Sequence, residues 1–194
     1  GGKGATYHHN LLAHHDSRTP RLANRPMYVQ QDTTDLRNNV YYNWAGNGCY
    51  GGEGMKVNIV NCYYKPGPGT MQSKSGRNAT RIAGLGITTK ETDGSYMIWG
   101  KYFIDGNVNP NYPTVTKDNW GVGVYPHISD NTGTYTSTTK DTMRLREPLD
   151  FMYVTTHTAE RAYEKVLQYA GASLHRDEVD NLVVSDTRNG KATY

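Results

Sequence analysis

The stretch Ala5-Thr6-Tyr7-His8-His9-Asn10-Leu11-Leu12 sets the pattern of this chain, because three later stretches resemble it. Each one is a short β-prone run with a polar residue at a matching place. The three are Asp35-Leu36-Arg37-Asn38-Asn39-Val40-Tyr41-Tyr42, Val57-Asn58-Ile59-Val60-Asn61-Cys62-Tyr63-Tyr64 and Tyr96-Met97-Ile98-Trp99-Gly100-Lys101-Tyr102-Phe103. The matching polar positions are Asn10, Asn39, Cys62 and Lys101. They recur at intervals of roughly 20–40 residues, as structural repeats do.

These repeats predict an all-β chain: a right-handed parallel β-helix with long loops and short C-terminal helices. Each strand would stack on its equivalent about 4.8 Å away, so that like residues form ladders. An Asn at each bend suits this arrangement, because its amide both donates and accepts hydrogen bonds and tolerates the left-handed conformation. A β-sandwich with Asn-rich turns is the alternative, since the Gly and Asn residues between the runs also permit it.

Three regions follow from the pattern along the chain. Residues 1–105 carry the repeated runs and are expected to form the β-helix coils, truncated on the N-terminal side. Residues 106–150 are rich in Asn, Thr, Gly and Pro with little periodicity, which predicts irregular loops wrapping the stack. Residues 151–194 are expected to form a helical extension, with Thr158 as an N-cap, Gly171 as a stop and a second helix near 177–186.

Composition limits the classes of function. The net charge is only +3, and the 21 Lys and Arg residues are scattered, so the chain shows no footprint for nucleic acid. No run of about 18 apolar residues is present, so no membrane span is predicted. The 16 Tyr residues suit half-exposed strands that pack a ring and keep its hydroxyl wet. Cys49 and Cys62 could form one disulfide or remain buried thiols.

The histidines near the start offer little support for a metal centre. In an extended strand, His8 and His9 point to opposite faces and cannot jointly hold one ion, so we expect a structural role in a ladder. The chain contains no Gly-x-Ser-x-Gly elbow and no His-Glu-x-x-His motif, and its carboxylates are too dispersed to nominate a glycosidase pair.

The stretch Asp16-Ser17-Arg18-Thr19-Pro20-Arg21 is the sharpest local feature. Pro20 fixes its own backbone and biases Thr19 toward an extended conformation, so Arg18 and Arg21 are presented from a stiffened segment. A guanidinium fork binds carboxylates bidentately, which suits recognition of an acidic sugar. The alternative is structural, with either arginine paired to Asp16 or to a neighbouring loop.

The order Tyr7-His8-His9-Asn10-Leu11, Arg18-Thr19-Pro20-Arg21 and Arg37-Asn38-Asn39-Val40-Tyr41-Tyr42-Asn43-Trp44 resembles polysaccharide lyase family 1, the pectate and pectin lyases. The resemblance extends through Asn61-Cys62-Tyr63-Tyr64-Lys65-Pro66-Gly67-Pro68 and Asp118-Asn119-Trp120. It implies a β-helix enzyme that cuts polygalacturonate by calcium-assisted β-elimination and leaves a 4,5-unsaturated end.

The resemblance also implies roles for single residues. Arg18 matches the arginine that the family uses as a base, and Pro20 matches the proline two places on. A substrate-binding arginine expected five residues after Arg18 falls on Ala23, so Arg21 or Arg25 would have to supply that contact. The Ca²⁺ ligands of the family are expected mainly upstream of the His-His-Asn strand, and this chain shows no legible calcium site.

The predicted protein is therefore a pectate lyase, secreted or periplasmic, of which this chain would be a fragment. Its partner would be polygalacturonate or pectin, with no nucleic acid and no membrane, and it would be a monomer or paired with its own N-terminal segment. Two alternatives stay open: a non-catalytic module that binds acidic polysaccharide, and a β-helix glycosidase acting on pectin.

Overall fold

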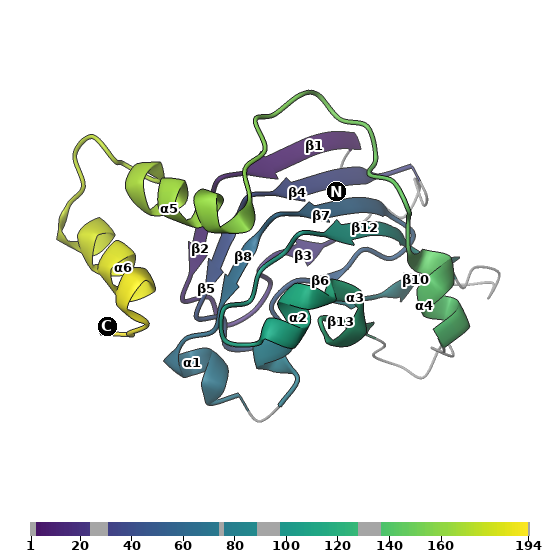
Figure 1. Cartoon of the computed structure of the whole chain (residues 1–194), viewed down its shortest axis with the longest axis horizontal. Helices are drawn as coiled ribbons and strands as arrows, with labels where there is room; N and C mark the ends of the chain where they lie inside the picture. Colours follow the sequence, from purple (N-terminus) through teal and green to yellow (C-terminus); the bar gives the residue numbers. More distant parts are fainter. Residues whose placement is uncertain (1–2, 24–30, 74–75, 89–97, 128–136, 194) are drawn as a thin grey trace.

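Three parallel sheets form the centre of the molecule (Figure 1). The computed structural model describes residues 3–23, 31–73, 76–88, 98–127 and 137–193. Sheet A contains β1 (Lys3–His8), β4 (Thr33–Arg37), β7 (Lys56–Val60) and β12 (Lys101–Asp105). Sheet B contains β2 (Leu11–Ala13), β5 (Val40–Tyr42) and β8 (Tyr63–Lys65). Sheet C contains β3 (Arg21–Leu22), β6 (Tyr50–Gly51), β9 (Ala83–Leu85) and β13 (Val124–Pro126).

The chain visits the three sheets in turn. The strands β1, β2 and β3 follow one another into sheets A, B and C, and β4, β5, β6 and then β7, β8, β9 repeat this order. We call each such group of three strands a circuit. Strands far apart in the sequence thereby become neighbours: β4 pairs with both β1 and β7, and all pairs within the three sheets are parallel. A short antiparallel pair, β10 (Ile87–Thr88) with β11 (Ile98–Trp99), lies outside them.

Side chains at matching places stack to make the core between the sheets. In sheet A, Leu36 aligns with Ile59, and Ile59 aligns with Ile104, and all three are buried. In sheet B, the ring of Tyr41 stacks on that of Tyr64 with centroids 4.6 Å apart. Alternate residues of a strand point to opposite faces, so the same strands also present a polar row outward.

The corner between sheets A and B is built from side-chain amides. The Oδ1 of Asn39 accepts from the backbone N and the Nδ2 of Asn10 at 3.1 and 2.9 Å, and its own Nδ2 donates to the carbonyl of Tyr7 at 2.9 Å. One circuit further on, the backbone N of Cys62 donates to Oδ1 of Asn107 at 2.9 Å. The residue before each corner is left-handed: His9, Asn38, Asn61 and Gly106 have φ of 54°, 54°, 49° and 67°.

The predicted alignment is confirmed for its first three positions and wrong for the fourth. Leu11, Val40 and Tyr63 share one register row, so Asn10, Asn39 and Cys62 are equivalent. Lys101 instead pairs with Lys56 at the start of a strand, and the place after Cys62 belongs to Asn107. The sequence pattern misplaces the fourth run because residues 98–104 are mostly apolar, and an apolar pattern alone does not mark the corner between sheets A and B.

The predicted fold class, an all-β right-handed parallel β-helix, is wrong. The described residues form a mixed α/β structure that contains several short parallel sheets and six α-helices. The helices are α1 (Pro68–Met71), α2 (Pro113–Lys117), α3 (Asn119–Val122), α4 (Ser137–Met143), α5 (Ala159–Tyr169) and α6 (Glu178–Asn189). In the region without periodicity, α2 begins at a proline, and Oδ1 of Asp118 caps α3 by accepting from the N of Trp120 at 3.1 Å. Such short helices form from local caps, and their length is too small for a hydrophobic period.

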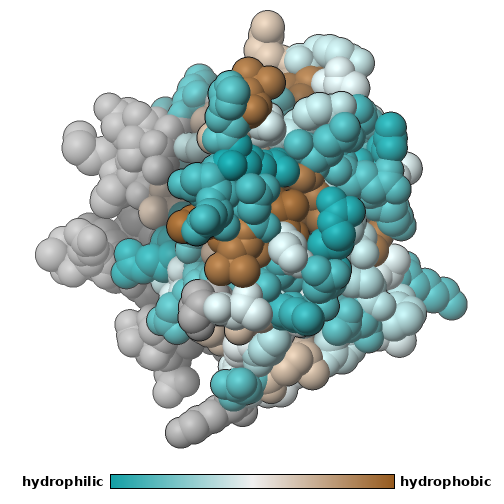
Figure 2. Space-filling view, turned by 90° about the vertical axis from the view of Figure 1, so that its left-hand side faces the viewer, coloured by the Kyte–Doolittle hydropathy of each residue, from teal (hydrophilic) through white to brown (hydrophobic). Residues whose placement is uncertain are grey.

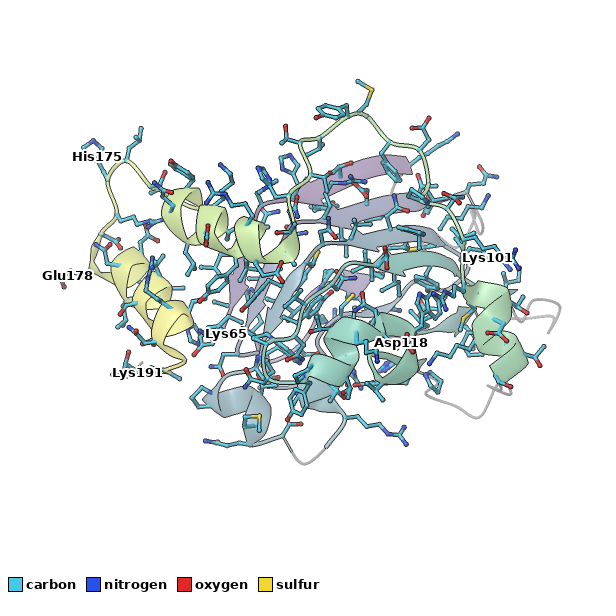
Figure 3. All side chains as sticks on the ribbon, in the orientation of Figure 1. Lys65, Lys101, Asp118, His175, Glu178 and Lys191 are labelled. Atoms are coloured by element: carbon cyan, nitrogen blue, oxygen red, sulfur yellow. The ribbon has the colours of Figure 1, made fainter. Side chains whose placement is uncertain are left out.

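Helix α5 packs against β5 and β8 of sheet B, and α6 follows it on the same side of the molecule (Figure 1). On this side, hydrophilic residues surround a smaller patch of hydrophobic ones (Figure 2). As predicted, Thr158 caps α5, its side chain accepting from the N of Arg161 at 3.3 Å, and Gly171 follows the helix with φ +72°. Lys65 of β8 reaches the end of α6, where Nζ donates to the carbonyls of Thr187 and Arg188 at 2.8 and 2.9 Å (Figure 3). A lysine at a helix C-terminus suits the dipole and the free carbonyls there. None of the described helices is both long and apolar enough to cross a membrane.

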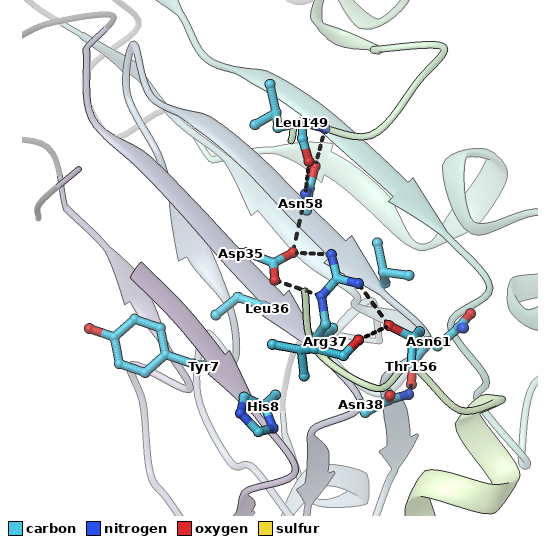
Figure 4. Close-up of polar contacts among 12 residues, drawn as sticks. Tyr7, His8, Asp35, Leu36, Arg37, Asn38, Asn58, Asn61, Leu149 and Thr156 are labelled. Atoms are coloured by element: carbon cyan, nitrogen blue, oxygen red, sulfur yellow. Dashed lines mark hydrogen bonds and ion pairs between the residues drawn. The ribbon is translucent and has the colours of Figure 1, made fainter. Parts of the chain in front are cut away.

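An extended segment, residues 147–157, crosses the outer face of sheet A between α4 and α5; we call it the strap (Figure 4). Two asparagines of the sheet hold it in reciprocal pairs. Asn58 exchanges hydrogen bonds with the backbone of Leu149 at 3.0 and 2.9 Å, and Asn38 does so with that of His157 at 2.8 and 2.8 Å. The strap therefore covers a polar surface that would otherwise be open.

Candidate functional site

The turn that carries Arg18 joins sheet B to sheet C. Arg18 is exposed and left-handed, with φ 63°, and no other described residue forms a hydrogen bond or an ion pair with its guanidinium. Thr19 behind it is buried, and its N donates to the carbonyl of Gly48 at 2.8 Å. The peptide bond between Thr19 and Pro20 is cis. The backbone is thus anchored on the next circuit while the guanidinium stays in solvent.

The guanidinium of Arg21, the first residue of β3, is already paired with a carboxylate of the protein. Its Nη1 and Nη2 lie 3.0 and 2.8 Å from the two carboxylate oxygens of Glu53, and Nη1 also donates to the carbonyl of Leu22 at 2.5 Å. The guanidinium carbon lies 5.0 Å from the centre of the Tyr50 ring. The protein's own carboxylate therefore occupies the place where an acidic sugar was predicted to bind.

Gly51 allows this close packing of Arg21. A Cβ on Gly51 would lie 1.5 Å from Nη1 of Arg21, and the residue has φ +103°. A side chain at this position would displace the arginine and strain the backbone. The sequence showed a Gly-rich turn here, but it did not show that the turn makes room for an ion pair.

One row of sheet C faces away from the core. Arg21, Tyr50, Gly84 and Tyr125 share this register row, while the neighbouring Leu22 and Leu85 are buried. Because Gly84 has no side chain, the rings of Tyr50 and His127 meet above it with centroids 4.5 Å apart. A row of aromatic rings thus lies across the strands.

Arg81 is a second guanidinium on this face, and sequence reasoning missed it. Its guanidinium carbon lies 4.9 Å from the centre of the Tyr125 ring, and Nη1 donates to the carbonyl of Asn47. Asn47 precedes Gly48, which anchors Thr19, so Arg18 and Arg81 flank the same loop. The apolar stretch Ile82-Ala83-Gly84-Leu85 could have pointed to Arg81. Such a stretch predicts a buried strand, and an arginine directly before it lies at the edge of a sheet face.

We call these groups the cationic face: Arg18, Arg21, Arg81, His127, Tyr50 and Tyr125. Burial lowers the pKa of His127, and the charges of Arg81 and Arg21 lower it further, while Glu53 opposes them. This pattern shows that positive charge predominates around the histidine. Such a surface attracts anions, and the rings of Tyr50 and Tyr125 lie beneath the guanidiniums of Arg21 and Arg81.

Pro20 and Arg25 are the remaining residues that the sequence predicts for the site. Pro20 and Arg21 border a pocket of about 490 Å³ at the open end of the first circuit, whose other walls include Tyr7 and Leu36. Arg18 is not part of that lining. Arg25 lies outside the described residues. The structure thus brings Arg18, Pro20 and Arg21 together along one turn and strand.

The described part of this face does not fit a calcium ion. Both carboxylate oxygens of Glu53, which lies beside the face, bind Arg21, and Ca²⁺ prefers several free oxygen ligands. No group of three His, Cys, Asp or Glu residues in the described ranges could hold a metal ion.

The N-terminal histidines meet, contrary to the expectation that they diverge. His9 leaves the strand in a left-handed conformation, so its Nδ1 lies 2.9 Å from Nδ1 of His8. Its Nε2 lies 3.0 Å from Nδ1 of His157 on the strap. Because His9 uses a different nitrogen for each neighbour, the three rings form a chain of hydrogen bonds and do not converge on one point.

The two cysteines are free and buried. Burial raises the pKa of Cys49 to about 12 and that of Cys62 to about 12. Both thiols therefore stay protonated and unreactive at neutral pH, and they act as core side chains.

No family model matches the sequence, and no curated protein matches it significantly.

Proposed function

We propose that the chain is part of a pectate lyase, secreted or periplasmic, that acts on polygalacturonate, with Arg18 as the base. The exposed guanidinium of Arg18, held by a backbone anchored on the next circuit, carries this proposal. The surrounding positive charge and aromatic rings suit a polymer of carboxylate-bearing sugars. The proposal rests on these residues and on the resemblance of their motif.

The reaction would be a β-elimination. The neutral guanidine of Arg18 takes the proton from C5 of a galacturonate unit, and the electrons of that C–H bond form the C4–C5 double bond. The bond from C4 to the glycosidic oxygen breaks, and the departing oxygen takes a proton from water. Alkaline pH favours this step, because arginine side chains are protonated near neutral pH. Calcium, which the resemblance implies, would acidify the C5 proton, with ligands expected outside the described face.

Turnover of polygalacturonate tests the proposal through the ultraviolet absorbance of the unsaturated product. General-base catalysis is worth about 10²–10⁴-fold, so Arg18→Ala is expected to lower kcat by that range at unchanged thermal stability. Arg18→Lys should not restore full activity, because lysine lacks the planar fork. Arg161→Ala on the exposed side of α5 is the control and should keep full turnover. Normal turnover in Arg18→Ala would exclude Arg18 as the base.

A non-catalytic module that binds acidic polysaccharide is the second candidate. The guanidiniums of Arg21 and Arg81 over tyrosine rings favour it, because a positively charged surface attracts a polyanion whether or not it cuts the polymer. Saturable binding of polygalacturonate with no unsaturated product at any pH, with or without calcium, would support this candidate.

A further inference from the structure

Arg21 and Arg81 hold similar places on sheet C but differ in their counter-ions. Each guanidinium lies over a tyrosine ring, at 5.0 Å from Tyr50 and at 4.9 Å from Tyr125. Arg21 is neutralised by Glu53 at 2.8 Å. Arg81 has no carboxylate partner among the described residues: its Nη1 binds a backbone carbonyl, and its Nε is buried without a hydrogen-bond partner. Of these two guanidiniums, only that of Arg21 is therefore neutralised by a carboxylate of the described residues.

The position of Arg81 places this charge beside the proposed base. Arg81 binds the carbonyl of Asn47, and the next residue, Gly48, accepts the hydrogen bond from Thr19, the neighbour of Arg18. Neighbouring strands of a sheet lie about 4.8 Å apart. A polymer that crosses the strands of sheet C would therefore meet Arg18 and Arg81 with different sugar units.

We propose that Arg81 binds the carboxylate of a uronate unit next to the one that Arg18 deprotonates, and that it selects free carboxylates over methyl esters. This inference rests on the proposed function, because it assigns a second subsite to the same face. The planar guanidinium offers two parallel donors to a carboxylate, whereas a methyl ester has lost the charge and one good acceptor. The ring of Tyr125 lies beneath it and helps to hold the plane of the fork.

Binding of two polymers to Arg81→Gln tests the inference. The probes are polygalacturonate and fully methyl-esterified pectin, measured by titration calorimetry on the full chain. Hydrogen bonds between charged groups contribute about 1.5–3 kcal/mol, so we expect Arg81→Gln to weaken binding of polygalacturonate about tenfold or more. Binding of the methyl ester should change less than twofold. In turnover, the loss should appear as a raised KM with kcat nearly unchanged.

Arg144→Gln is the matched control. Its guanidinium also lies over an aromatic ring, 5.5 Å from the centre of Trp120, but Arg144 directly follows α4 and bridges Tyr102 of sheet A, so it does not belong to sheet C. The substitution removes the same charge and should leave both affinities unchanged. Arg81→Lys, which keeps the charge and loses the fork, should show an intermediate loss, and thermal unfolding of all three variants reports any damage to the fold.

The outcomes separate this inference from the proposed function. If Arg81→Gln binds polygalacturonate as well as Arg144→Gln does, Arg81 is not a carboxylate subsite, while the role of Arg18 is unaffected. Equal losses for the acid and the ester would also overturn the inference, because they would indicate a general defect of the face. If the unchanged protein does not bind polygalacturonate at all, the proposed function itself fails.

Discussion

The outer faces of sheets A and C both carry an arginine paired with a carboxylate, but only one of the two pairs is enclosed. On sheet A, Arg37 binds Asp35 at 2.6 and 2.8 Å, with side-chain exposures of 16% and 0%, under the strap (Figure 4). On sheet C, the side chains of Arg21 and Glu53 keep exposures of 30% and 17%. The two ion pairs therefore share their chemistry and differ in their exposure to solvent.

The largest expected effect comes from breaking the covered pair. Arg37→Met leaves the carboxylate of Asp35 fully buried, with Asn58 as its remaining partner at 3.1 Å. Removing one member of a buried ion pair costs about 3–5 kcal/mol, so we expect a loss of that size in the free energy of unfolding. Urea denaturation measures it, with Arg161→Ala on the exposed pair with Glu164 as a control that should change little. A loss below about 1 kcal/mol would mean that the strap does not enclose the pair in solution.

The attachment of the strap should matter next. Asn38→Gly keeps the left-handed backbone but removes both bonds to His157 and the bond to the carbonyl of Asn61 at 3.0 Å. Each buried polar group left unsatisfied costs about 1–3 kcal/mol, which sets the expected loss of stability. Hydrogen exchange at the amide of His157 should become faster. Asn61→Gly, which removes a single bond to His157 at 2.9 Å, should show the smaller effect, and the reverse order would contradict this assignment.

Breaking the open pair should cost less than either of these changes. Glu53→Gln is expected to change the free energy of unfolding by about 0.2–1 kcal/mol, because the pair is partly exposed. It should also strengthen binding of polygalacturonate, since it frees the fork of Arg21. Titration calorimetry of this variant with polygalacturonate measures the change in affinity. Weaker binding would show that Glu53 positions Arg21 for the ligand and does not block it.

The smallest expected effect is the pH dependence of the strap. Burial lowers the pKa of His9, with His8, His157 and Lys165 lowering it further, so the folded state prefers the neutral ring. A histidine with a lowered pKa stabilises the fold above its unfolded value, and this contribution is lost as pH falls through the lower folded value. We expect the melting temperature to fall between pH 7.5 and pH 5, partly because of His9.

His9→Asn separates this contribution from the other titrating groups. Asparagine accepts the left-handed backbone at this position and does not titrate, so the dependence on pH should become shallower. An unchanged slope would mean that His9 does not contribute.

Much of the fold could be read from local signals, and part of it could not. The corner residues Asn10 and Asn39 were found because amides at a bend are locally recognisable, and Thr158 marked α5 in the same way. The short helices α2 and α3 escaped, because four or five residues are too few for a hydrophobic period. The all-β prediction failed for that reason.

By itself, the sequence determined three of the four strand runs with their corners, and the turn that carries Arg18, because each depends on neighbours along the chain. Only the tertiary structure decided which arginine is paired with a carboxylate of the protein. Glu53 lies 32 residues from Arg21 and reaches it when β6 pairs with β3, whereas no described carboxylate pairs with Arg81. Electrostatic pairing depends on distance in space, so whether a guanidinium is free to bind a ligand is settled by how the circuits stack.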